Sequence, residues 1–289
     1  MKRVLVTGGT GFVGRNSMPL LQEKFEIIAP RRCDVDLLDP SAFRCYAERQ
    51  QFDVLLHLAN PNPAKNALDS NDRMFEDSMR AFSSVYGCSD LCEKIVYLGS
   101  GAEMDKRLDM HLIEEMDFGR SFPNDDYGKA KYIQNQIARR GEGIVNLRLF
   151  ACYGPWDHWS KFITHCIRSV IAQQPITIRQ DCVFDYLHVY DLARVLCWAI
   201  EDTQEYRDYN VSTGKEILLT EIAQMVLDEM HSALPIKVQV DGMNKSYSAS
   251  NRRLADEMGK VDDIDIQEGI RMQIEHEVSV YPVDGYEQL

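Results

Sequence analysis

Tyr127 and Lys131 stand four residues apart in the segment DDYGKAKY (125–132), a spacing that places two side chains on one face of an α-helix. A lysine ammonium close to a phenol favours the phenolate, so the pair predicts a lowered tyrosine pKa and general acid–base catalysis by Tyr127. The same spacing also occurs by chance on an ordinary solvent-facing helix. The chemistry of the pair therefore depends on what the rest of the chain places beside it.

Ser100 is the third candidate catalytic residue. It ends the run KIVYLGS (94–100), which predicts a buried strand. Open α/β sheets bind their ligands at the carboxyl ends of such strands. We expect the Ser100 hydroxyl to hydrogen-bond to the same substrate oxygen that exchanges a proton with Tyr127.

The segment VTGGTGFVG (6–14) predicts a dinucleotide site. Gly8, Gly11 and Gly14 follow a predicted strand and stand at the start of a predicted helix. The glycines allow a tight turn and a close approach of a pyrophosphate to the backbone, and the helix N-terminus supplies free N–H groups. A glycine triplet alone is weak evidence, and the strand–turn–helix context is what favours the cofactor over a purely structural turn.

Arg31 and Arg32 follow the second predicted strand, where dehydrogenases that prefer NAD often carry an acidic residue. A guanidinium suits the 2′-phosphate of NADP because it offers forked, charged donors. The sequence therefore favours NADP(H), with NAD(H) as the alternative cofactor and two ordinary surface arginines as the competing interpretation. Asp36 is expected to meet the adenine amine of the cofactor, with the apolar Leu37 beside it.

Strands alternate with helices over the first half of the chain, which predicts right-handed βαβ units and a parallel sheet. After this half the segments become shorter and mixed. We therefore expect an α/β fold: a Rossmann-type doubly wound parallel sheet with a smaller, mixed α/β C-terminal substrate lobe. The cofactor-binding domain is expected to span 1–154 with a returning segment near 180–212, and the substrate lobe 155–179 and 213–289.

The pattern of apolar residues predicts the individual elements. Pro19 lies inside the first predicted helix, so that helix should bend or start late. Asp191 is expected to cap the helix that it begins. The predicted strands are 3–9, 25–30, 53–60, 94–100, 144–150, 176–179 and 208–211, and the later predicted helices are 40–51, 66–93, 125–140, 159–173, 191–201 and 219–230.

The 289 residues carry a net charge of −13 with a pI near 5.0, which argues against a nucleic-acid backbone or an anionic membrane as the main partner. No apolar stretch has the length of a secretory signal or a membrane span. The eight cysteines are scattered, and Cys88 and Cys92 lack the further ligands of a zinc site. We therefore expect a cytoplasmic protein with reduced core thiols and no metal centre.

Taken together, the glycine loop, Ser100 and the Tyr127–Lys131 pair resemble the extended short-chain dehydrogenases/reductases, the NAD(P)-dependent epimerase/dehydratase group that acts on nucleotide sugars. The likeness covers nearly the whole chain. TGGTGFVG is similar to the family's glycine loop, LLHLAN to its strand beside the nicotinamide ribose, and YGKAK to its YxxxK motif, while LRLFACYGP, FDYLHVYDLARVL, NRRLADEMG and IQEGIRMQI are similar to later family segments. The resemblance implies cofactor contacts at Thr10, Phe12, Val13, Leu58, Ala59, Asn60, Tyr127 and Lys131.

Two departures from the family pattern narrow the expected reaction. Sugar dehydratases of the family carry Asp and Glu after the residue equivalent to Ser100, whereas this chain has Gly101 and Ala102, so elimination of water is not expected. The LGS and RRCDVDLLD segments look closest to GDP-fucose synthase-like reductases, which use NADPH. Those enzymes have a cysteine at the position of Ala102 for epimerisation, and its partner histidine aligns with Lys161. The resemblance thus supports hydride transfer and does not support epimerisation of that kind.

The resemblance also implies a substrate site. Many relatives carry an arginine at the position of Phe184 that contacts the substrate diphosphate, and Arg179 is expected to take its place. The loop WDHWSKF (156–162) is expected to form a wall of this site, with a packed surface loop as the alternative. The expected substrate contacts are Asn60, Ser100, Lys161 and Arg179.

Three functions remain open. The first is NADPH-dependent reduction of a 4-keto nucleotide-diphosphate sugar with Tyr127 as proton donor, and the second is a nucleotide-sugar 4-epimerase that holds NAD tightly. The third is a non-catalytic NAD(P)-binding sensor or regulatory protein, against which the intact Ser–Tyr–Lys set counts. Family members are commonly dimers through two helices of each subunit, so a homodimer through the helices 66–93 and 125–140 is expected.

Overall fold

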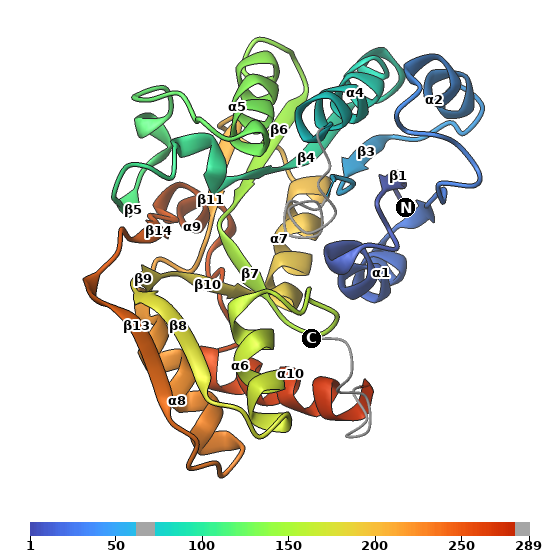
Figure 1. The fold of residues 1–289 in the computed structure, drawn as a ribbon. Coiled ribbons are helices and arrows are strands. Elements are labelled where there is room, and N and C mark those ends of the chain that lie inside the picture. Colours follow the sequence, from blue (N-terminus) through green and yellow to red (C-terminus); the bar gives the residue numbers. More distant parts are fainter. Residues whose placement is uncertain (62–72, 281–289) are drawn as a thin grey trace.

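The computed structural model describes residues 1–61 and 73–280, and its centre is a parallel β-sheet (Figure 1). Within the described residues this sheet has six strands in the order β11-β6-β4-β3-β1-β2, and every neighbouring pair is parallel. The strands are β1 (Arg3–Thr7), β2 (Glu26–Ile28), β3 (Val54–His57), β4 (Lys94–Ser100), β6 (Ile144–Leu149) and β11 (Asp208–Val211).

Helices cover both faces of the sheet, which makes the fold doubly wound. The side chains of β1 alternate between the two faces: Val4 and Val6 pack in one core with Leu196, and Leu5 packs in the other with Phe82. The expected Rossmann-type α/β fold is confirmed. The helices are α1 (Phe12–Lys24) and α7 (Val189–Glu201), which pack together on one face, and α2 (Pro40–Ala47), α4 (Met74–Tyr86) and α5 (Asp126–Ala138), which lie side by side on the other.

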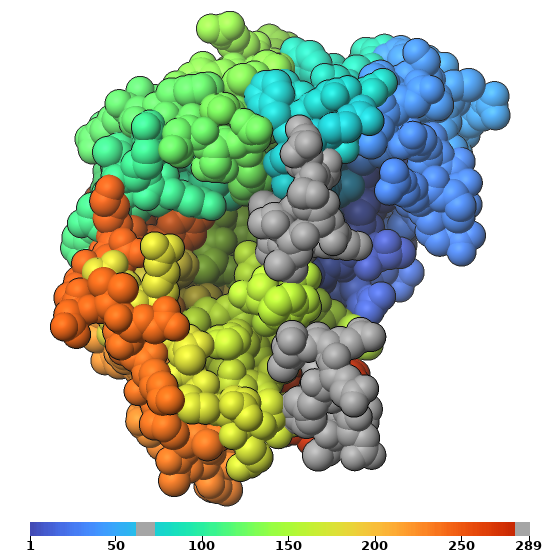
Figure 2. All heavy atoms as spheres, viewed as in Figure 1, coloured from blue at the N-terminus to red at the C-terminus, as the bar shows by residue number. Residues whose placement is uncertain are grey.

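A smaller lobe lies below the sheet in Figure 1. Its helices and a parallel strand pair enclose a separate core that includes Ile167, Ile222 and Ile270. In Figure 2 the yellow and orange segments of this lobe lie directly against the rest of the molecule. The elements of the lobe are α6 (Phe162–Ile171), β8 (Ile176–Asp181), α8 (Leu219–Glu229), β13 (Ile236–Met243) and α10 (Ile266–Val280).

Short strands join the lobe to the sheet. β7 pairs with β10 in parallel, and a mixed sheet in the order β12-β9-β14-β5 combines one strand of the N-terminal half with three from the C-terminal half. Over residues 1–61 and 73–280, no helix combines the length and hydrophobicity that a membrane crossing needs. These elements are β5 (Met110–Ile113), β7 (Ala151–Tyr153), β9 (Val183–Phe184), β10 (Tyr186–His188), β12 (Ile217–Leu218) and β14 (Tyr247–Ala249), with α9 (Arg252–Met258) packed against β11.

The predicted elements that differ from the structure differ mainly at their ends. Of the predicted helix 66–93, residues 66–72 lie outside the described residues, and α4 ends at Tyr86. The prediction beyond Tyr86 is wrong because the chain turns through the short 3-10 helix Ser89–Leu91 before it enters β4. The helix predicted over 159–173 is shorter at both ends, since α6 begins only after the loop that follows β7.

The predicted cap of α7 is wrong. α7 begins directly after His188, whose side chain accepts the N–H of Tyr190 at 3.3 Å and so caps the helix. Asp191 lies within the first turn of α7. Its carboxylate instead accepts two backbone N–H groups, at 3.2 and 3.1 Å, from the segment that precedes α10. Asp191 therefore connects α7 to the second lobe.

α1 runs from Phe12 to Lys24 with the exposed Pro19 inside it, so the late start expected for this helix is not observed. A proline has no N–H for the helical ladder, and an interior proline costs a helix about 3 kcal/mol relative to alanine. We expect Pro19→Ala to raise the free energy of unfolding by about 1–2 kcal/mol, because the more flexible unfolded chain offsets part of the gain.

Urea unfolding of the two proteins measures this difference. Glu23→Ala, an exposed change in the same helix, is the control and should change the free energy of unfolding by less than about 0.5 kcal/mol. A lower urea midpoint for Pro19→Ala than for the unchanged protein would contradict the prediction.

Candidate active site

The loop between β1 and α1 depends on its glycines. Gly8 has a φ of +78°, and a Cβ there would lie 2.5 Å from the amide nitrogen of Ala59. A Cβ on Gly14 would lie 2.3 Å from the carbonyl oxygen of Gly8. Gly11 is the N-cap of α1 and offers no side chain to its first-turn N–H groups. The loop thus has the shape and the free donors of a cradle for a pyrophosphate.

A first cavity, of about 370 Å³, opens on one side of this loop and extends to the segment after β2 and to the end of β3. Arg31 pairs with Asp34 at 3.4 Å, whereas the exposed Arg32 forms no hydrogen bond or ion pair with any described residue. Arg32 is therefore the guanidinium available to a ligand. The predicted cofactor residues that line this cavity are Gly8, Thr10, Arg31, Arg32, Asp36, Leu37, Ala59 and Asn60.

A second cavity, also of about 370 Å³, is bounded by the first turn of α1, the end of β4, the start of α5 and the loop 156–162. Leu58 and Lys131 line neither cavity: Leu58 packs against the core of the sheet, and Lys131 is buried beside β4. The predicted site residues that line the second cavity are Phe12, Val13, Ser100, Tyr127 and Lys161.

Arg179 lies outside the second cavity. It lines a third cavity, of about 350 Å³, which shares the side chains of Lys106, Phe184 and Tyr247 with the second. The two cavities therefore adjoin. A ligand that contacts both Tyr127 and Arg179 has to extend across the two adjoining cavities.

Tyr127 lies in the first turn of α5, whose N-cap Asp125 accepts the N–H of Gly128 at 2.8 Å. Burial raises the pKa of the Tyr127 phenol to about 12, and a hydrogen bond with Ser100 acts in the opposite direction. The Ser100 Oγ also accepts the N–H of Ala102 at 3.2 Å, which orients the serine side chain. At neutral pH Tyr127 is therefore a protonated phenol next to a serine hydroxyl.

Lys131 is almost completely buried, and its Nζ donates to the carbonyl oxygen of Leu98 at 2.8 Å. The Nζ lies 6.0 Å from the centroid of the Tyr127 ring, and burial lowers the pKa of Lys131 to about 8. The lowered tyrosine pKa expected from this pair is wrong. The burial of the phenol outweighs an ammonium that is directed to a backbone carbonyl.

Sequence reasoning missed three side chains of the second cavity. Tyr247 comes from β14 and lines the cavity together with Ser100 and Tyr127. Lys106 follows the turn after Ser100, and its Nζ lies 5.9 Å from the centroid of the Tyr127 ring. Asp157 is buried, which raises its pKa to about 7. Only the loop around Asp157 carried a signal in the sequence, because the tertiary structure alone brings the other two to the site.

The sequence model of the NAD dependent epimerase/dehydratase family matches residues 4–212. The chain belongs to this family. The matched region includes the glycine loop, Ser100 and the Tyr127–Lys131 pair, so the family resemblance noted in the sequence is confirmed.

Similar proteins of this family act on nucleotide sugars. A GDP-L-fucose synthase from Azorhizobium caulinodans is 26% identical over 248 residues, which are 78% of this chain and 80% of that protein. The GDP-mannoheptose C4 reductase of Campylobacter jejuni, solved with NADP bound, has a TM-score of 0.81 at 16% identity and covers 95% of this chain and 98% of its own. The UDP-glucose 4-epimerase of Thermus thermophilus, in complex with NAD, has a TM-score of 0.78 at 22% identity over 95% and 98%. These relatives and structural neighbours are enzymes of nucleotide-sugar reduction or epimerisation, and two of the structures hold NADP or NAD.

Gly14→Ala should weaken NADPH binding at least about tenfold. The added Cβ would meet backbone atoms of Gly8 and Gly9 at 2.3 and 2.6 Å, so the cradle has to open. Fluorescence titration with NADPH measures the change. The control is Gly9→Ala in the same loop, where the Cβ comes closest to the movable methyl end of Met18. Equal affinities of Gly14→Ala and the unchanged protein would show that the loop does not hold the cofactor.

Proposed function

We propose that this protein reduces a 4-keto nucleotide-diphosphate sugar with NADPH. The observation that carries the proposal is the second cavity, which is lined by Ser100 and Tyr127 together with Val13 from the first turn of α1. A cofactor pyrophosphate at the glycine loop and a sugar in this cavity would be neighbours. Gly101 and Ala102 offer no acid or base beside Ser100, so the site suits reduction better than elimination of water.

The residues present fit a dinucleotide. Gly8 and Gly14 keep the backbone cradle open, and the start of α1 supplies N–H groups without a side-chain cap. Arg32 lines the first cavity, and its guanidinium has no partner among residues 1–61 and 73–280, which favours NADP(H) over NAD(H). The bound reduced nicotinamide would supply the hydride.

The side chains of this protein would bind the C4 oxygen and protonate it. Ser100 would donate a hydrogen bond to that oxygen, because its Oγ already accepts the N–H of Ala102. Tyr127, protonated at neutral pH, would give its proton to the same oxygen as the carbonyl becomes an alcohol. The nearby Lys131 ammonium would then stabilise the phenolate that remains.

Cations gather around the substrate cavities of a chain whose net charge is −13. Lys106 lines both the second and the third cavity, Lys161 lines the second, and Arg179 and Lys245 line the third. We propose that these side chains bind the substrate diphosphate, while Ser100 contacts the sugar. Asn60, also expected at the substrate, lines the first cavity and not the second, so its proposed role is in cofactor binding. The distribution fits a substrate whose sugar lies at Tyr127 and whose nucleotide extends toward the second lobe.

Three further proposals concern the whole chain. Residues 1–154 with 180–212 would bind the cofactor, and residues 155–179 with 213–289 would bind the substrate. A homodimer would form through α4 and α5, and light scattering on the purified protein tests this.

The eight cysteines, all within the described residues, are free thiols, which fits a location in the reducing cytoplasm.

Turnover with a panel of 4-keto sugar nucleotides tests the reaction. We expect net consumption of NADPH, and we expect Tyr127→Phe to slow it about 10²- to 10⁴-fold because the proton donor is lost. Tyr132→Phe, a change on the same helix outside the second cavity, is the control. Retained NAD(H) with interconversion of 4-epimers and no net oxidation would instead favour the 4-epimerase. Absence of turnover with every sugar nucleotide, with NADPH binding unchanged in Tyr127→Phe, would favour the sensor.

Arg32→Ala should weaken binding of NADPH about tenfold or more and leave binding of NADH nearly unchanged, because only NADPH carries the 2′-phosphate. Arg31→Ala is the comparison and should have a smaller effect, since Arg31 already pairs with Asp34. Parallel titrations with the two cofactors measure both variants. Equal losses of NADPH and NADH affinity in Arg32→Ala would contradict the NADP assignment.

A further inference from the structure

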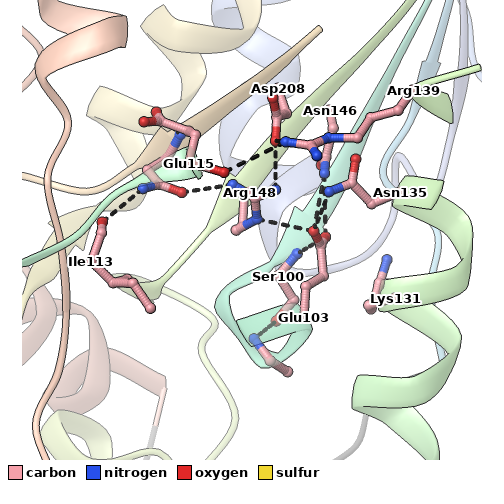
Figure 3. Close-up of polar contacts among 12 residues, drawn as sticks. Ser100, Glu103, Ile113, Glu115, Lys131, Asn135, Arg139, Asn146, Arg148 and Asp208 are labelled. Atoms are coloured by element: carbon pink, nitrogen blue, oxygen red, sulfur yellow. Dashed lines mark hydrogen bonds and ion pairs between the residues drawn. The ribbon is translucent and has the colours of Figure 1, made fainter. Parts of the chain in front are cut away.

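Glu103 is a fully buried carboxylate next to Ser100, and Figure 3 shows the polar contacts around it. It belongs to the 3-10 turn Gly101–Met104 that follows Ser100. Its Oε1 accepts the backbone N–H of Ser100 at 3.0 Å, and its Oε2 accepts the side-chain amide of Asn135 at 3.0 Å. The carboxylate therefore connects the turn that carries Ser100 with helix α5.

Asn135 stands one helical turn after Lys131 and two turns after Tyr127 on α5. A hydrogen bond to Asn135 thus fixes the position of the helix that carries both side chains. Glu103 thus links the element that carries Ser100 to the helix that carries Tyr127 and Lys131. The sequence does not indicate a role for Glu103, because its side-chain partners Asn135 and Arg148 come from other elements of the fold.

The pocket around Glu103 is shaped for a carboxylate. The Nε of Arg148 donates to it at 2.9 Å, and the side-chain amide of Asn146 lies 3.2 and 3.3 Å from its two oxygens. A Cβ on Gly99 would lie 2.3 Å from its Oε1, so only a glycine in β4 leaves room for it. The donors come from β4, β6 and α5. Hydrogen bonds to Glu103 therefore connect the sheet with α5.

We propose that Glu103 is a positioning residue that sets the distance between Ser100 and the Tyr127–Lys131 pair and holds a negative charge behind them. The inference rests on the proposed roles of Ser100, Tyr127 and Lys131 in reduction. A simpler role, compensation of the Arg148 charge, would not need the contacts to Ser100 and Asn135.

The charge of Glu103 acts on both members of the pair. It raises the pKa of Lys131 against the effect of burial, and it adds to the burial that raises the pKa of Tyr127. Removal of the charge should therefore lower the pKa of both Lys131 and Tyr127.

Other charged or titratable groups also face Glu103, Tyr127 and Lys131. They are His57 from β3, Tyr97 from β4, Lys106 and Asp125 from the loops before α5, Arg148 from β6, and Tyr247 from β14.

Glu103→Gln tests the proposal, because it keeps the shape of the side chain and removes its charge. Glu115→Gln is the matched control: Glu115 is a buried carboxylate of the same polar network, and its side chain accepts the N–H of Asn210. Its contact with Arg139 at the end of α5 goes through the backbone carbonyl of Glu115, which the substitution keeps. The readouts are kcat and KM for the 4-keto sugar nucleotide and the pH titration of Lys131, followed by NMR in protein labelled at lysine and assigned with Lys131→Arg.

We expect Glu103→Gln to lower kcat about tenfold or more with little change in the Kd of NADPH, and to move the Lys131 titration to lower pH. Glu115→Gln should leave both unchanged. Glu103→Asp should keep the Lys131 titration close to that of the unchanged protein, because the charge remains, while its shorter side chain lowers kcat. Unchanged kcat and unchanged titration in Glu103→Gln, or equal effects in Glu115→Gln, would overturn the proposal.

One measurement keeps this inference separate from the proposed function. The Lys131 titration needs no turnover, so it tests the charge of Glu103 even if no 4-keto sugar nucleotide is a substrate. If Glu103→Gln does not fold, Asn135→Ala replaces it, since that change leaves the contacts of Glu103 with Ser100 and Arg148 in place. A fall in kcat with Asn135→Ala supports the positioning role, and an unchanged kcat overturns it.

Discussion

Arg148 is fully buried, and the free energy needed to remove a guanidinium from water constrains every element around it. It is compensated by Glu103 after β4 at 2.9 Å and by Asp208 of β11 at 2.7 Å. Segments that are distant in the sequence therefore form ion pairs with the same guanidinium. Loss of either carboxylate would leave Arg148 partly unpaired in the interior, and breaking a buried pair of this kind typically costs about 3–5 kcal/mol. This requirement keeps the strand before Ser100 in a fixed relation to the strand that returns from the second lobe.

The second cavity lies where the two parts of the chain meet. The sheet and its helices supply Ser100 and Tyr127, whereas β14 supplies Tyr247 and the loop 156–162 supplies Lys161. The glycine cradle needs only β1 and α1, so a cofactor site can form within the first part. The second cavity is lined by residues of both parts, so its shape depends on how they pack together.

Burial has the largest effect on the pKa values of Tyr127 and Lys131. It raises the pKa of Tyr127 and lowers the pKa of Lys131, so each group is moved toward its neutral form. A neutral phenol is the form that donates a proton, which agrees with reduction of a carbonyl. The Glu103 carboxylate opposes the effect of burial at Lys131 and so helps to keep an ammonium close to the phenol. The pKa of Lys131 thus reflects two opposing effects, its burial and the charge of Glu103.

The sequence alone determined the alternation of strands and helices, the glycine loop and the Ser100, Tyr127 and Lys131 set, because these depend on local spacing and on apolar runs that the chain displays directly. It did not determine where α4 ends, what caps α7 or how burial changes the pKa of Tyr127, since each depends on groups supplied by distant segments. Short strands such as β14 have no periodicity to detect, so Tyr247 entered the site only through the fold. The same holds for Glu103, whose role comes from partners on β4, β6 and α5 that only the folded chain brings together.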